Sequence, residues 1–140
     1  MAGPSPHLTW AELACKDGTP YPEAWRAYRA VILADVFDVL RGACGGRPLR
    51  VLSAYRSPAH NTAIGGARRS QHLQGRALDL APPAGMTMDG FWVYVRTLAE
   101  DDTRIGGVGR YQTFAHLDIR PRTSGKLTVW AGKGIKDDTP

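Results

Sequence analysis

Two short segments of this sequence combine histidine and aspartate within stretches that are otherwise mostly apolar. The first reads SQHLQGRALDL and covers residues 70–80, with an imidazole at His72 and a carboxylate at Asp79. Gly75 lies between them and permits a sharp backbone turn, because a residue without a Cβ adopts conformations that other residues avoid. Imidazole and carboxylate groups are suited to binding a metal ion or transferring protons.

The carboxylate of this first segment falls in a strand that we predict over residues 76–81. Alternate side chains of a strand point to opposite faces, so Ala77 and Asp79 share one face. Leu78 and Leu80 share the other face, which we expect to pack on the core. Burying an acid in such a strand costs free energy unless the charge is paired or bound to a metal. Considered alone, the aspartate could instead hydrogen-bond to loop amides, and the histidine could lie exposed on its loop.

The second segment reads FAHLDI and begins at Phe114. In a strand, Phe114, His116 and Asp118 share one face. A histidine and an aspartate that project together from an apolar strand are difficult to explain as core packing. The two segments together supply two imidazoles and a carboxylate, and a catalytic zinc ion typically has three protein ligands and an open position for water. The candidate ligands are therefore His72, Asp79 and His116.

The rest of the chain contains patterns for helices and short strands that could position these two segments. Apolar residues at three- and four-residue spacing predict a long helix, and Ser57 before Pro58 predicts the start of a short one. The predicted helices cover residues 23–41, 57–64 and 87–98, and the predicted strands cover residues 49–54, 76–81, 114–119 and 127–130. This mixed order indicates the α+β class, in one small domain over residues 1–140 with flexible termini.

Both segments resemble signatures of one family, the zinc D-alanyl-D-alanine carboxypeptidases and L-alanyl-D-glutamate endopeptidases of bacteria and phages. That family is related to the vancomycin-resistance dipeptidase and the hedgehog domain. SQHLQGRALD matches the family's serine and His-x-x-Gly-x-Ala-x-Asp at every defined position, and FAHLD matches its closing histidine motif. SAYRS at residues 53–57 and GGVGRY at residues 106–111 also resemble family segments. The resemblance covers residues 8–130 and implies a central, mainly antiparallel sheet with helices packed on it and a zinc cleft.

The resemblance also implies roles for individual residues. The implied ligands of one zinc ion per chain are His72, Asp79 and His116. Arg56 would lie in the cleft, where its fork of donors suits an oxyanion or a substrate carboxylate. Ser70 and Gln71 would contact the substrate, although a serine at this position could equally cap its loop.

The chain differs from the family pattern at the position expected for the general base. Several members place Glu or Asp three residues before the closing histidine, where this chain has Thr113. Asp118 is then the candidate for the catalytic base, which would take a proton from water and pass it to the leaving amine. The alternative is that Asp118 orients a metal ligand or the substrate amine, as carboxylates behind metal ligands often do.

These roles imply a zinc peptidase that hydrolyses peptide bonds in bacterial peptidoglycan. It would remove terminal D-Ala or cut the L-Ala–D-Glu bond of the stem peptides, acting as a monomer in phage lysis or in wall remodelling. The alternative is a zinc-bound module without catalytic activity, such as a structural component of a virion. Thr113 in place of an acid is the feature that supports this alternative.

Composition and charge indicate which kinds of partner the chain could bind. The formal charge of +5 and the pI of about 9.6 suit an anionic partner such as an acidic wall polymer. Nucleic-acid binding is not expected, because the basic residues are scattered and only Arg68 and Arg69 form a local pair.

The compartment and the state of the thiols are further expectations. No apolar run approaches the roughly 20 residues of a membrane span, and no signal peptide is visible at the amino terminus. We therefore expect cytoplasmic accumulation followed by release to the periplasm or cell wall, or transport in a virion. Cys15 and Cys44 lack CxxC spacing and are expected to be reduced thiols, with a single bridge between them as the alternative.

Overall fold

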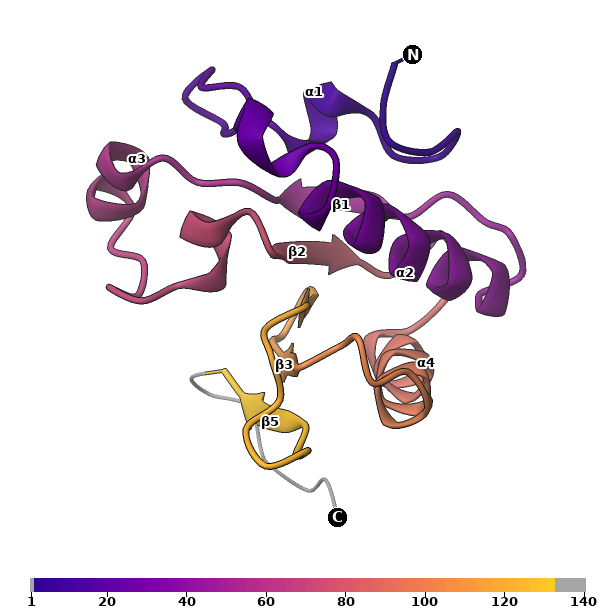
Figure 1. Cartoon of the computed structure of the whole chain (residues 1–140). Helices are drawn as coiled ribbons and strands as arrows, with labels where there is room; N and C mark the ends of the chain where they lie inside the picture. The colour runs from indigo at the N-terminus through magenta and orange to yellow at the C-terminus, as the bar shows by residue number, and fades with distance from the viewer. Residues whose placement is uncertain (1, 133–140) are drawn as a thin grey trace.

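The computed structural model describes residues 2–132 and contains a five-stranded sheet with helices packed on it (Figure 1). This architecture confirms the predicted α+β class with a mainly antiparallel sheet. The C-terminal end, for which the sequence predicts flexibility, lies outside the described residues. The helices are α1 (Trp10–Leu13), α2 (Arg29–Ala43), α3 (Pro58–Ala63) and α4 (Met88–Asp101), with 3-10 helices η1 (Glu23–Trp25) and η2 (Gln71–Gln74). The strands are β1 (Arg50–Ser53), β2 (Ala77–Ala81), β3 (Gly107–Arg110), β4 (Ala115–Asp118) and β5 (Thr128–Ala131).

The sheet has the strand order β1-β2-β4-β3-β5. Its pairs are antiparallel except for β3 and β5, which run parallel. In the pairing of β2 with β4, Asp79 lies directly opposite His116. Side chains at opposed positions of neighbouring strands approach within roughly 5 Å. Strand register therefore brings together two residues that are far apart in the sequence.

One face of the sheet carries the hydrophobic core. Leu78 and Leu80 of β2 and Leu117 of β4 belong to the same buried cluster as Phe37 of α2 and Phe91 of α4. Helices α2 and α4 contact each other, and α4 also contacts β3 and β4. Among residues 2–132, no helix combines the length and the apolar character needed to cross a membrane. The predicted inward direction of Leu78 and Leu80 is correct, which leaves Asp79 on the opposite face.

Capping side chains explain where three of the helices begin. Ser57 accepts a hydrogen bond from the amide of His60 and caps α3, and Thr87 caps α4 in the same way through Gly90. Both helices lie close to their predicted ranges. The short helix α1 is not predicted, although Thr9 and Glu12 form the reciprocal hydrogen bonds of a capping box at its start.

The long predicted helix at residues 23–41 is partly wrong. The chain forms η1, turns, and begins α2 only at Arg29. Tyr28 and Val39 of the predicted apolar face are 73% and 45% exposed. Trp25 instead packs edge-on against Tyr21 and Tyr55, and this aromatic contact favours the break before α2. The buried face of α2 consists of Ala30, Leu33, Ala34, Val36, Phe37 and Leu40.

Strand β3 is not predicted, because two of its four residues are glycines, which are depleted in strands. It forms because it pairs with β4 on one side and β5 on the other. A Cβ on Gly109 would lie 2.4 Å from the indole of Trp130. The absence of a side chain at this position therefore lets the tryptophan of β5 lie close over the sheet.

Two valines of α2 give a matched test of the face that packs on the core. Val36 is fully buried and Val39 is 45% exposed, whereas helix propensity affects both substitutions alike. We expect Val36→Ala to lower the free energy of unfolding by roughly 2 kcal/mol, because buried apolar groups are lost and a cavity remains. Val39→Ala should change it by less than about 0.5 kcal/mol. Urea denaturation measures both, and equal losses would contradict this orientation of α2.

Candidate metal centre

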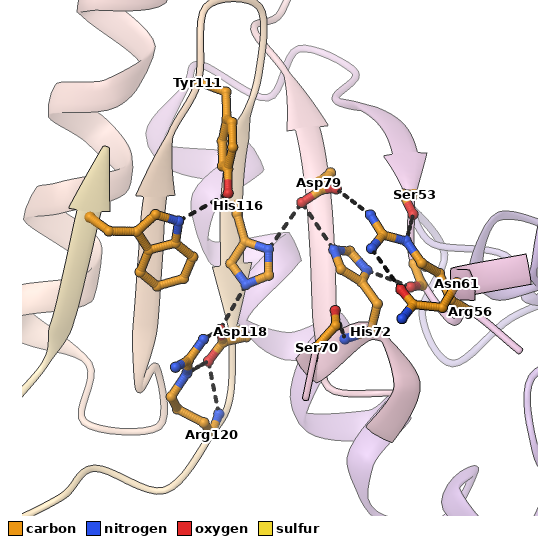
Figure 2. Close-up of polar contacts among 12 residues, drawn as sticks. Ser53, Arg56, Asn61, Ser70, His72, Asp79, Tyr111, His116, Asp118 and Arg120 are labelled. Carbon is orange, nitrogen blue, oxygen red and sulfur yellow. Dashed lines mark hydrogen bonds and ion pairs between the residues drawn. The ribbon is translucent and has the colours of Figure 1, made fainter. Parts of the chain in front are cut away.

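Three buried side chains from three elements converge beside the sheet. His72 comes from η2, Asp79 from β2 and His116 from β4, and their exposed fractions are 2%, 6% and 7%. His72 Nε2 and His116 Nδ1 each lie 3.1 Å from Asp79 Oδ1 (Figure 2). One ligand atom from each residue lies within 4.8 Å of the other two. The three residues that the sequence places together are therefore adjacent, with nitrogen atoms around one carboxylate oxygen.

The helix η2 positions His72. Ser70 accepts a hydrogen bond from the His72 amide at 3.2 Å and so caps the helix. Gly75 ends it in the left-handed region with φ of 64°, as the predicted sharp turn requires. Tyr21 donates a hydrogen bond to the carbonyl of Gly75 at 2.7 Å. The segment predicted as a loop is thus a fixed turn, and it directs His72 toward Asp79.

Hydrogen bonds behind the two rings determine which nitrogen carries the proton. His72 Nδ1 lies 2.6 Å from the carbonyl oxygen of Ala54, which can only accept. His116 Nε2 lies 2.7 Å from Asp118 Oδ2, and an ionised carboxylate also only accepts. Each ring can therefore donate to the outside, which would leave its other nitrogen available to a metal ion beside Asp79.

This arrangement fits a metal ion. His72 Nε2 is buried and has no hydrogen-bond partner of acceptable geometry, although it lies close to Asp79. A buried lone pair without a donor costs free energy, and a cation between the three groups would remove that cost. Two imidazole nitrogens and a carboxylate are ligands that zinc takes in catalytic sites. A carbonyl or carboxylate behind each ligating histidine is also typical of such sites.

The ionisation states agree with this donor set. Burial opposes the charge of Asp79, but hydrogen bonds from His116 and His72 outweigh it and hold the Asp79 pKa well below its usual range. Burial likewise opposes the charge of Asp118, and its bonds to His116 and Arg120 lower its pKa to about 2. Burial lowers the pKa of His72, whereas at His116 burial is outweighed by the bonds to Asp118 and Asp79, which raise the pKa. Near neutral pH both carboxylates are charged and His72 is neutral, as metal ligation requires, and His116 would release its Nδ1 proton when a metal ion binds.

Asp118 lies behind His116 and not in the cleft. It is fully buried, and besides His116 it accepts hydrogen bonds from Arg120 Nε at 2.8 Å and Arg120 Nη2 at 2.6 Å (Figure 2). It does not line the cleft. A base must reach the proton that it takes. The geometry therefore favours the alternative role, in which Asp118 orients a ligand.

Thr113, the position at which the family resemblance would place an acid, is exposed. Thr113 lies in the bend between β3 and β4, outside the lining of the cleft. Among residues 2–132, Asp79 is the only acidic residue in that lining.

Arg56 lies in the cleft, as the sequence predicts, and three neighbours hold its guanidinium. Nε donates to Ser53 at 3.2 Å, Nη1 to Asn61 at 3.3 Å, and Nη2 lies 3.4 Å from Asp79 Oδ2. A Cβ on Gly66 would lie 2.1 Å from the Asn61 oxygen and 3.2 Å from Arg56 Nη1. The loop after α3 therefore closes against this arginine, and its remaining N–H groups can bind a substrate.

The cleft has a volume of about 450 Å³. The predicted substrate contacts Ser70 and Gln71 line it together with the triad and Arg56. The prediction did not include several other lining residues, which are Arg69, Tyr111, Phe114, Arg120 and Trp130. Tyr111 ends the GGVGRY segment, so the family motif was the available signal for it, and Trp130 lies in the predicted last strand.

Aromatic side chains form the wall beside His116. The Trp130 ring lies 5.0 Å from the His116 ring, and Trp130 Nε1 donates to the Tyr111 hydroxyl at 3.0 Å. Tyr111 stacks on Phe114 with a centroid distance of 4.5 Å. The guanidinium of Arg120 lies 5.1 Å from the Trp130 ring centre. This wall limits the motion of His116 and leaves the Tyr111 proton free to donate into the cleft.

A family model described as Peptidase M15 matches residues 6–118, a range that contains His72, Asp79 and His116. No curated protein matches the chain.

The position of Asp118 leads to a test of its role. We expect Asp118→Asn to weaken metal binding by about 10- to 100-fold, because a neutral amide is a weaker acceptor for the His116 Nε2 proton than a carboxylate. Competition with a chelator measures the affinity. A catalytic base would instead leave the affinity unchanged while turnover is lost. Asp102→Asn is the matched control, because Asp102 also pairs with an arginine, Arg104, but lies outside the cleft.

Proposed function

The chain belongs to the peptidase M15 family, and we propose that it is a zinc-dependent peptidase that hydrolyses peptide bonds of bacterial peptidoglycan. The observation that carries this proposal is the buried triad of His72, Asp79 and His116 at the base of an open cleft. Zinc bound by these three residues would supply Lewis acidity, which makes water more acidic and polarises a carbonyl group. The bonds to cleave are the terminal D-Ala bond or the L-Ala–D-Glu bond of the stem peptide.

We assign the binding of the reacting carbonyl to Arg56. Its guanidinium is planar and already held by Ser53 and Asn61, so little reorganisation is needed when negative charge develops on the substrate oxygen. The same fork would bind a substrate carboxylate. Its ion pair with Asp79 also keeps that carboxylate turned toward the two histidines.

Two further residues have supporting roles in the proposed reaction. Asp118 holds the Nε2 proton of His116 and so keeps the Nδ1 lone pair available. The Tyr111 hydroxyl accepts from Trp130 and can donate its own proton to a substrate oxygen or to the leaving amine. We assign substrate contacts to Ser70 and Gln71, which lie on the cleft wall formed by η2 and the residue before it.

Stem peptides suit the charge of this cleft. They carry carboxylates on D-Glu and on the terminal residue, and Arg56 and Arg69 contribute positive charge to the lining. The chain as a whole has a formal charge of +5, which favours approach to an anionic envelope. We propose that the enzyme acts as a monomer in phage lysis or wall remodelling, and reaches the wall after release from the cytoplasm or as part of a virion.

A second candidate is a zinc-bound module that binds the wall without cleaving it. The supporting observation is that the lining described for residues 2–132 contains one carboxylate, Asp79, while Thr113 occupies the position of the usual acid. This candidate predicts metal binding and peptidoglycan binding without release of products.

Release of muropeptides from purified peptidoglycan separates the two functions. We expect the zinc-loaded protein to release peptides whose masses identify the cleaved bond, and a chelator to abolish release, because the triad requires its metal. His72→Ala should remove both zinc and activity. His7→Ala is the matched control, since His7 is exposed and outside the cleft. Zinc-loaded protein that binds wall material from several bacteria but releases nothing would favour the binding module.

The role of Arg56 has its own test. Arg56→Lys keeps the charge but removes the planar fork of donors. We expect kcat/KM on the cleaved muropeptide to fall by about 100- to 1,000-fold while zinc content stays unchanged. Arg68→Lys, at an exposed arginine outside the cleft, should have no effect. A parallel loss of zinc would show instead that Arg56 mainly supports Asp79.

A further inference from the structure

A second cluster of potential ligands lies outside the cleft. Cys15 follows α1, Asp17 lies in the turn after it, and His60 belongs to α3. The cysteine sulfur, a carboxylate oxygen and an imidazole nitrogen all lie within 4.8 Å of one another. None of the three residues lines the cleft. The cluster therefore combines three types of ligand from two segments that are far apart in the sequence.

Ser57 holds the members of this cluster in place. Its hydroxyl donates to Asp17 Oδ2 at 2.6 Å, and its backbone amide donates to Cys15 Sγ at 3.4 Å. The Ser57 hydroxyl also accepts from the amide of His60. The amide of Thr19 donates to Asp17 Oδ1 at 2.9 Å. The side chains are therefore positioned before any ligand binds, which reduces the entropy cost of binding.

The sulfur is both buried and available for ligation. Cys15 is 4% exposed and its thiol is free. Its close neighbours are the amide and the hydroxyl of Ser57, and the hydroxyl is 3.9 Å away. Asp17 is exposed and His60 is partly exposed, so an ion can enter from their side and keep water as a further ligand.

We propose that Cys15, Asp17 and His60 form a second metal site, which binds a zinc ion or a divalent ion of similar softness. Thiolate, imidazole and carboxylate are all ligands of zinc, whereas calcium and magnesium take oxygen ligands. Thiolate and carboxylate together carry two negative charges, which neutralise a divalent ion. This site is independent of the function proposed for the cleft.

The site would fix one wall of the cleft. An ion bound there joins the N-terminal segment to α3, and the next residue of α3 after His60 is Asn61. Asn61 accepts from Arg56 and donates to the carbonyl of Ala67 at 3.0 Å. Ala67 lines the cleft. The second ion is therefore structural, and its loss should loosen α3 and the loop after it.

Cobalt(II) distinguishes the two sites because only one contains sulfur. A thiolate bound to cobalt gives a sulfur-to-metal charge-transfer band in the near ultraviolet, and two histidines with an aspartate give none. We expect the full-length apoprotein to develop this band on titration with cobalt under reducing conditions. His72→Ala should keep the band and lose one bound ion. Cys44→Ser, at the other buried free thiol, is the matched control and should also keep it.

Variants of the second cluster complete the test. Cys15→Ser should abolish the band, and His60→Gln, on a partly exposed helical position that tolerates substitution, should weaken cobalt binding at least tenfold. Native mass spectrometry should show one zinc ion fewer in both. The proposal is overturned if saturating cobalt gives no charge-transfer band, if the band survives in Cys15→Ser, or if His60→Gln binds cobalt as tightly as the unaltered protein. Loss of the band in Cys44→Ser alone would also overturn it.

Discussion

Burying the charge of Asp79 in the central pair of strands costs several kcal/mol unless other groups compensate for it. The surrounding structure supplies that compensation. Arg56 lies against one carboxylate oxygen, and two histidines present nitrogen atoms to the other. Each of these groups has its own support, such as the Ala54 carbonyl behind His72 and the Asp118 carboxylate behind His116. A single buried acid thus fixes the chemistry of both histidines.

The groups that compensate the charge of Asp79 are positioned by the pairing of the strands and by the turn before β2. Register between β2 and β4 sets His116 opposite Asp79, and β4 also places Asp118 where Arg120 can neutralise it. The turn that ends at Gly75 fixes the entry into β2 and the direction of η2. Asp79 and His116 of the candidate metal centre are therefore also paired residues of the sheet. A substitution among them should disturb folding and ligand geometry together, because the same contacts serve both.

Local signals in the sequence were sufficient for the parts of the molecule that depend on neighbours in the chain. Alternation predicts β2 and β4, Ser57 and Thr87 predict the starts of α3 and α4, and the spacing of His72 and Asp79 indicates a shared cleft. Glycine-rich β3 could not be predicted, since pairing with two other strands stabilises it. The start of α2 was wrong because Trp25 packs on aromatic residues from elsewhere.

In the candidate site, too, some features follow from short sequence motifs and others depend on residues that are distant in the sequence. The three potential ligands follow from motifs, whereas the orientation of Asp118 depends on Arg120 and on the ring of His116. Alternation correctly places Asp118 on the same face as His116, but it does not distinguish a side chain in the cleft from one behind a ligand. Trp130 and Tyr111 come together only through the pairing of β3 with β5.

Strand β5 is at the edge of the sheet and pairs with β3 alone. Its Trp130 nevertheless forms part of the wall beside His116, and it lies beyond residues 6–118, which the family model matches. An edge strand can change its side chains with little effect on the central pairings. The molecule therefore separates the central pair of strands, which carries Asp79 and His116, from an edge strand that contributes one wall of the cleft. The shape of the cleft can therefore be altered from the edge of the sheet, while the strand pairing that brings His116 opposite Asp79 stays the same.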